Sequence, residues 1–253
     1  MAGTPISFSI VKTCDQNKKL EKDESGYYKV TLGAINSFNS AGNFYIADGV
    51  RDLVEGPSSL FNKRLKSGYL NGELGHPEFK PGMSQVDYIN RNLKIDIANI
   101  SHHIKEVIFV PTDIPSGRPG AGNIIKIMGW IKPSGPKGSV LQQSIENYDQ
   151  NTAFSIRCLT KDNMVNGTVI KQILSIITWD NVVEPGIKHA NSWDTLAQEG
   201  FDIATFYAED VLKEESKIAK QIGLESADDI TMLKQVCQRA ISPTQHIDSF
   251  LKW

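Results

Sequence analysis

The chain has 253 residues, of which 40% are hydrophobic and 22% are charged, and its formal net charge at neutral pH is −2. A chain of this length can bury a large core in one domain, or in one domain with an appendage, without a metal or disulfide staple. The small net charge lacks the basic footprint of a protein that binds nucleic acid or an anionic membrane surface.

The cysteines and the N-terminus indicate an intracellular protein. Cys14, Cys158 and Cys237 lie far apart and show no Cys-x-x-Cys spacing, which argues against a disulfide framework or a zinc site. The first residues lack the basic region and apolar run of a secretory signal, and no apolar run is long enough to cross a bilayer. We therefore expect a soluble protein in a reducing compartment.

Strand patterns dominate the first two thirds of the chain. Residues 26–38 place apolar side chains at every second position, which predicts a strand, and residues 42–49 predict a second, short strand. Residues 56–68 predict a helix, with Pro57 near its start and Gly68 at its end. Alternating or β-branched apolar segments predict further strands over 92–100, 104–110, 123–131, 152–160 and 168–180. The segment between the third and fourth of these, residues 137–150, predicts a short helix.

About seven strands interrupted by occasional helices favour a mainly β, α+β domain with a barrel or sandwich over alternating β-α-β units. Near residue 190 the pattern changes, and residues 201–223 and 226–242 have helical spacing. The sequence therefore predicts a β-rich domain over 1–204 and a helical C-terminal segment over 205–253.

Several familiar catalytic motifs are missing. The chain has five histidines but no His-Glu-x-x-His, no Gly-x-Ser-x-Gly and no glycine-rich phosphate loop, so a zincin, an α/β-hydrolase elbow and nucleotide binding lack support. Three short segments remain as candidates: Gly-Glu-Leu-Gly-His-Pro at 72–77, Ser-Ile-Arg at 155–157 and Asp-Asn-Val-Val-Glu-Pro at 180–185. A histidine can act as a general base when a nucleophile lies within reach and a third group orients it, whatever the order along the chain.

In this order the three segments resemble the signature of the tailed-phage prohead proteases, the capsid-maturation serine peptidases related to the herpesvirus assemblins. The asparagine-rich residues 35–54 also resemble that family's strand pair leading into a helix, and the resemblance covers about residues 28–190. It implies an assemblin-like β-barrel surrounded by helices.

The resemblance also implies roles for individual residues. Ser155 would be the nucleophile, His76 the general base and Asp180 the group that orients the base, with no cofactor and no metal. Arg157 would help to hold the loop that stabilises the oxyanion. The chain departs from the family where it reads Ala-Phe-Ser-Ile-Arg-Cys at 153–158, because the family often has a glycine at each end of this run. That departure questions how closely a substrate backbone can approach.

The function that the resemblance implies is cleavage of scaffold or core proteins and of the propeptide of the major capsid protein, inside the immature capsid in the host cytoplasm. Cleavage in this family commonly follows Glu in an (Ile/Leu)-x-Glu context. Leu212-Lys213-Glu214 matches that context in a region expected to be exposed, which predicts self-cleavage after Glu214. A homodimer or weak self-association is also implied, with no nucleic-acid or membrane partner.

Structural alternatives stay open for each candidate residue. Ser155 could be a strand serine, His76 a turn residue and Asp180 a turn-forming residue. His102 is a rival base, because His102 and His103 on an alternating strand face opposite sides and one of them faces inward. At the level of function, the main alternative is a catalytically inactive scaffold or capsid-assembly protein with the same fold. An unrelated β-rich binding module is a further one.

Overall fold

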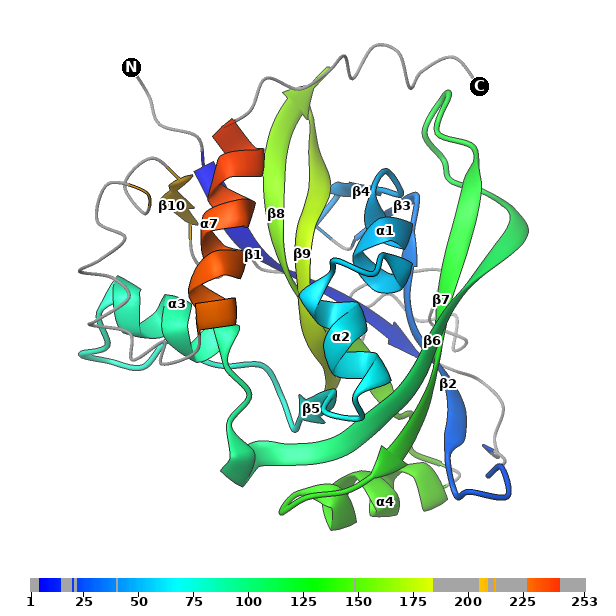
Figure 1. Ribbon diagram of the computed structural model, residues 1–253. Coiled ribbons are helices and arrows are strands. Elements are labelled where there is room, and N and C mark those ends of the chain that lie inside the picture. The colour runs from blue at the N-terminus through cyan, green and yellow to red at the C-terminus, as the bar shows by residue number, and fades with distance from the viewer. Residues whose placement is uncertain are drawn as a thin grey trace.

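The computed structural model describes residues 5–14, 20, 22–39, 41–147, 149–183, 205–208, 212 and 227–241, and its body is built from two β-sheets (Figure 1). The first sheet has the strand order β10 (Thr205–Tyr207), β1 (Pro5–Cys14), β8 (Ala153–Val165), β9 (Thr168–Val182), β4 (Phe44–Ile46) and β3 (Ser37–Phe38). The second has the order β2 (Tyr28–Ile35), β7 (Asn123–Pro133), β6 (Ile100–Pro115) and β5 (Asn71–Glu73). Between these strands every described pairing is antiparallel except that of β4 with β9, and an isolated bridge outside them is also parallel.

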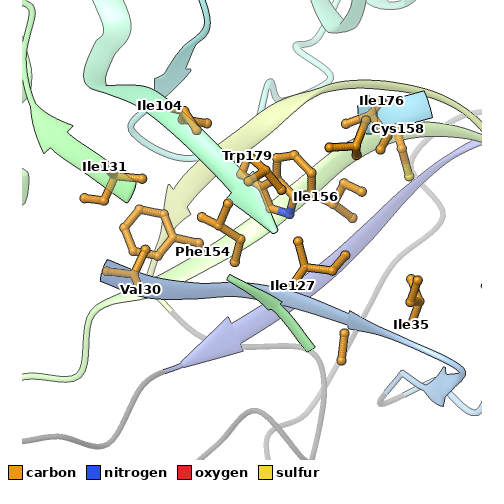
Figure 2. Close-up of a cluster of buried hydrophobic side chains, with 14 of the residues drawn as sticks. Val30, Ile35, Ile104, Ile127, Ile131, Phe154, Ile156, Cys158, Ile176 and Trp179 are labelled. Atoms are coloured by element: carbon orange, nitrogen blue, oxygen red, sulfur yellow. The ribbon is translucent and has the colours of Figure 1, made fainter. Parts of the chain in front are cut away.

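The main core lies between the two sheets. From the first sheet, Phe154, Ile156 and Cys158 on β8 and Trp179 on β9 enter it, and Figure 2 shows these side chains gathered against those of the second sheet. Successive side chains of a strand point to opposite faces, so the residues between them on β8, Ser155 and Arg157, point away from this core. The mainly β, α+β class predicted from the sequence is confirmed.

The two sheets meet at β5 and β9, which is where the Gly-Glu-Leu-Gly-His-Pro segment begins. Leu74 forms a parallel bridge with Asn181. The Thr178 hydroxyl donates a hydrogen bond of 2.7 Å to the carbonyl of Asn71. Because these contacts tie β5 to the end of β9, the turn that follows β5 is carried to the outer face of the first sheet.

Helices complete the fold: α1 (Val50–Glu55), α2 (Leu60–Lys66), α3 (Gln85–Leu93), α4 (Gly138–Glu146) and α7 (Ala227–Ile241). Ser59 caps α2 by accepting a hydrogen bond from the backbone of Asn62. At α3, Ser84 and Asp87 form a capping box, in which each side chain accepts from the backbone N–H of the other. No helix in the described ranges is long and apolar enough to span a membrane.

A second apolar cluster covers the outer face of β8 and β9. Helices α3 and α7 lie beside this face in Figure 1 and contribute buried side chains at helical spacing. Its buried members are Ile89, Leu93, Leu159, Leu174, Ile177, Ala208, Leu233, Val236, Cys237 and Ala240. The helix predicted over 226–242 is thus confirmed as α7, and it packs on the β-rich body.

Three sequence predictions were wrong in detail. No strand spans 92–100: Leu93 ends α3, residues 97–99 form a 3-10 turn (η1, Ile97–Asn99) and β6 begins only at Ile100. The helix predicted over 201–223 fails at Thr205–Tyr207, which pairs with β1 as β10, and most of its remainder lies outside the described residues. Residues 111–122 are rich in glycine and proline, which predicts a loop, but 111–115 are strand and extend β6 against β7.

Candidate active site

The register of β8 and β9 brings two of the predicted site residues face to face. Ser155 lies directly opposite Asp180, so their side chains project to the same side of the sheet. Arg157, two residues further along β8, projects to that side as well. All three side chains are buried on the outer face, opposite to the main core.

The Gly-Glu-Leu-Gly-His-Pro segment reaches this face through close backbone contacts. A Cβ at Gly72 would overlap the Trp179 carbonyl oxygen and the His102 ring, so only glycine permits the approach of β5 to β9. Gly75 has φ of 74° and donates a hydrogen bond of 2.6 Å to the Asn181 carbonyl, which turns the chain there. The imidazole Nδ1 of His76 then lies 2.8 Å from Asp180 Oδ2.

The charge on Asp180 fixes the proton on His76. Burial by itself would raise the pKa of the Asp180 carboxyl, but the charge of Arg157 and the hydrogen bonds from His76 and Arg157 hold it well below its usual range. An ionised carboxylate can only accept hydrogen bonds, so the neutral His76 ring carries its proton on Nδ1 and leaves a lone pair on Nε2. This is the tautomer that a general base requires.

Like Nε2 of His102 on the core side, two buried atoms at the site have no hydrogen-bond partner. They are Ser155 Oγ and His76 Nε2, a hydroxyl and the basic ring nitrogen. Unpartnered buried polar atoms are uncommon in folded proteins and often mark a functional site. Here they are the two groups between which a serine hydrolase transfers a proton.

Arg157 directs all five of its N–H groups to other protein atoms. Nε and Nη2 donate to the two carboxylate oxygens of Asp180 at 2.8 and 2.7 Å, and Nη2 also lies 3.0 Å from Glu73 Oε1. Nη1 donates to the carbonyls of Asn92 and Lys94 at the end of α3, at 3.4 and 3.1 Å. The guanidinium is therefore a counter-ion of Asp180, fastened to α3.

Glu73 carries a second buried carboxylate into the site. Burial would raise its pKa, but hydrogen bonding to Arg91 and the nearby charge of Arg157 hold the pKa of Glu73 below its usual range. Nη1 and Nη2 of Arg91 donate to this carboxylate, which also accepts from the Asp96 backbone at 2.9 Å and from Asn99 Nδ2 at 3.1 Å. The Glu73 backbone N–H in turn donates to Asp180 Oδ1 at 3.0 Å.

Sequence reasoning missed Arg91, because it predicted no helix over 85–93. The Ser84-x-x-Asp87 pattern was the available signal for that helix. The sequence alone leaves open whether the Glu73 side chain orders the His76 loop or is solvated. Its complete burial and its five contacts, from four residues, favour the ordering role.

His102, on β6, lies on the main-core side of β8, away from the face that carries Ser155. Its ring packs edge-on against Phe154, which points into the main core, with ring centroids 5.3 Å apart, and Ser101 Oγ lies 2.9 Å from its Nδ1. His103 points to the opposite side of β6, where its ring contacts the Tyr27 hydroxyl at 3.0 Å and the Gly68 carbonyl at 3.0 Å. Neither ring is brought to the face that carries Ser155.

His102 makes the fold sensitive to acid, because burial lowers the pKa of His102 to about 4. The unfolded chain binds this proton near pH 6.5, so from there down to the folded value the unfolded state binds more protons and stability falls with pH. The linkage between proton binding and folding gives a total loss of about 3 kcal/mol in the free energy of unfolding. We expect His102→Gln to reduce the loss of unfolding free energy between pH 7 and pH 4.5, measured by urea titration. His103→Gln is the control, and equal losses in His102→Gln and the unmodified protein would contradict the assignment.

The remaining predicted features give no further site. Cys158 is buried in the main core, as expected for a packing residue. Within the described ranges, no group of three or more His, Cys, Asp or Glu side chains is arranged to hold a metal ion. Glu214 and the end of the third motif, residues 184–185, lie outside the described residues.

Comparison with known proteins defines the class. Residues 6–236 match the Peptidase S80 family, and the chain belongs to that family, which makes it a peptidase. It is 37% identical over 243 residues to the capsid maturation protease of Pseudomonas phage phiKZ, covering 91% of this chain and 87% of that protein. Among solved structures it is similar to the bacteriophage T4 capsid assembly protease gp21, with 15% identity and a TM-score of 0.47 over 70% of this chain and 98% of that chain. The family resemblance stated from the sequence is confirmed.

Proposed function

We propose that this protein is a serine endopeptidase that processes capsid-assembly proteins during the maturation of a bacteriophage. The observation that carries the proposal is the His76–Asp180 contact of 2.8 Å on the face where Ser155 lies opposite Asp180. Membership of a peptidase family and the 37% identical phage capsid maturation protease support it.

In this proposal Ser155 Oγ attacks the carbonyl carbon of the scissile peptide bond, and its proton passes to His76 Nε2. Asp180 accepts the hydrogen bond from Nδ1 and stabilises the imidazolium that forms. Collapse of the tetrahedral intermediate breaks the C–N bond, and His76 gives its proton to the leaving amine. Water then attacks the acyl-enzyme, again with His76 as base, and restores the serine. Since all five N–H groups of Arg157 have partners, Arg157 is assigned a supporting role beside Asp180 and not direct donation to the oxyanion.

His76 is preferred to His102 as the base because of where each ring lies. His76 is held by Asp180 on the outer face of the sheet, whereas His102 packs on Phe154 on the inner face. The burial that lowers the pKa of His102 to about 4 also makes it a weak proton acceptor at neutral pH.

The proposed substrates are the scaffold or core proteins and the propeptide of the major capsid protein, cleaved after Glu inside the prohead in the host cytoplasm. Self-association and self-cleavage after Glu214, which would remove most of 205–253, belong to the same proposal. Of the described elements in that region, β10 precedes Glu214 and would stay on the body, whereas α7 would be removed, which would expose the part of the apolar cluster on β8 and β9 that α7 covers.

The test is incubation of the purified full-length protein with the scaffold and major capsid proteins of its own phage, followed by intact-mass spectrometry. We expect new masses that correspond to cleavage after Glu, together with labelling of Ser155 by a fluorophosphonate probe. Absence of both cleavage and labelling over a wide range of protein concentration would instead favour an inactive capsid-assembly protein.

A further inference from the structure

The strongest feature outside the Ser155, His76 and Asp180 set is a row of alternating charges that ends at His76. Arg91 contacts Glu73, Glu73 contacts Arg157, and Arg157 contacts Asp180, which contacts His76. Each link is an ion pair or a charge-assisted hydrogen bond. The row crosses four elements, since α3, β5, β8 and β9 supply its first four members.

We propose that Glu73 and Arg91 are positioning residues that set the pH range of catalysis by balancing the charge of Arg157 beside the Asp180–His76 pair. The proposal rests on the proposed function, in which His76 accepts a proton during the reaction. Neither residue touches the reacting atoms, and both act through Arg157 and Asp180.

Burial strengthens the electrostatic interactions along this row. The Glu73 and Asp180 side chains are 0% exposed, the Arg157 side chain 3% and the Arg91 side chain 26%. Charges in such a setting interact more strongly over several ångströms than they do in water. The two carboxylates and two guanidinium groups sum to zero, so a neutral cluster surrounds His76 before it takes up a proton.

Changing one member of the row changes the charge that the His76 imidazolium meets. Neutralising Glu73 leaves a positive excess on Arg157 and Arg91, which disfavours the protonated ring. Neutralising Arg91 leaves a negative excess on Glu73 and Asp180, which favours the protonated ring. The two changes therefore act in opposite directions, whereas mere loosening of the site would give both the same sign.

Other titratable groups lie around the row and stay unchanged in both variants. Asp96 Oδ2 lies 4.0 Å from Arg91, and the Tyr88 hydroxyl donates to the Pro77 carbonyl at 3.3 Å. Glu78 follows His76 on the same turn and is exposed, and His102 faces Asp180 from the core side.

The experiment compares Glu73→Gln and Arg91→Met in the full-length protein. For kcat/KM against pH, we expect the acidic limb to move by about one pH unit to lower pH in Glu73→Gln and to higher pH in Arg91→Met. The double variant Glu73→Gln, Arg91→Met restores a net charge of zero in the row, so its acidic limb should return toward that of the unmodified protein. The same shifts should appear when the His76 ring is titrated by NMR in the Ser155→Ala background, which needs no activity.

The matched control is the exposed ion pair Arg51–Glu55 on α1, with Arg51→Met and Glu55→Gln expected to leave both readouts unchanged. Shifts of the same sign, or no shift of the His76 titration in folded variants, would overturn the inference. If the NMR shifts have opposite signs but the unmodified protein cleaves nothing, the charge coupling stands and the proposed function fails. If Glu73→Gln does not fold, the sign is read from Arg91→Met, whose side chain is partly exposed.

Discussion

Replacing Ser155 by alanine is expected to abolish cleavage of capsid proteins, with kcat/KM falling by about 10⁴-fold or more. The change removes the proposed nucleophile, because Ser155 is the residue that lies opposite Asp180 in the register of β8 and β9. Because Ser155 Oγ is buried and has no hydrogen-bond partner, its removal leaves no polar atom unsatisfied. The variant should therefore be as stable as the unmodified protein, or more stable by about 1 kcal/mol. Intact-mass assays and urea unfolding measure the two effects.

Ser101→Ala is the matched control for this change. Ser101 is also a buried strand serine, but its hydroxyl contacts His102 Nδ1 at 2.9 Å. It should lose about 1 kcal/mol of stability and keep its protease activity. Cleavage by Ser155→Ala at an undiminished rate would remove Ser155 from the mechanism and, with it, the serine-peptidase proposal.

Arg157→Met is expected to have the largest effect on stability, a loss of about 3–5 kcal/mol in the free energy of unfolding. The change removes the counter-ion of buried Asp180 and one of the two counter-ions of buried Glu73, and it takes a donor away from the carbonyls of Asn92 and Lys94 at the end of α3. In a chain of this size the melting temperature should fall by about 10 °C. Calorimetry or urea titration at neutral pH gives the measurement.

The pH dependence of Arg157→Met provides a second check. Arg157 holds the pKa values of Asp180 and Glu73 below their usual range, so its stabilisation is present above the unfolded values and is lost as pH falls through the folded ones. The difference in the free energy of unfolding between the variant and the unmodified protein should therefore become smaller below about pH 4. The double variant Arg157→Met, Glu73→Gln should lose less stability than the sum of the two single variants. Strict additivity would show that the contact between the two side chains is energetically unimportant.

The strands that sequence alone could predict are those with one clear periodicity. β2, β7, β8 and β9 have apolar alternation or long β-branched runs, and each was found close to its predicted bounds. Helix α3 was missed because it is short and polar and runs directly into the alternating residues 93–97, which imitate a strand. Its burial of Ile89 and Leu93 depends on α7 and the outer face of β8 and β9, so the deciding contacts are distant in the chain.

The sequence named the residues of the candidate site but not their arrangement. The motifs named Ser155, His76 and Asp180, and the register of β8 and β9 together with the β5 turn explains how they approach one another. Sequence could not show that Arg157 directs its donors to Asp180 and Glu73, since that depends on where two sheets join. Arg91 belongs to no motif, and only the packing of α3 against β5 assigns it a role.

For the proposed protease, the complete burial of Ser155 Oγ has a consequence for latency. A peptide carbonyl must contact this atom, so substrate binding requires a conformation that uncovers it. The apparent affinity is then weakened by the fraction of molecules that are open, and one open molecule in a hundred costs about 3 kcal/mol of binding free energy. A capsid component that binds the open conformation preferentially would raise the activity, and the largest possible fold-increase equals one divided by the open fraction. In that case the free-energy difference between the closed and the open conformation would keep the activity of the protease low until such a component binds.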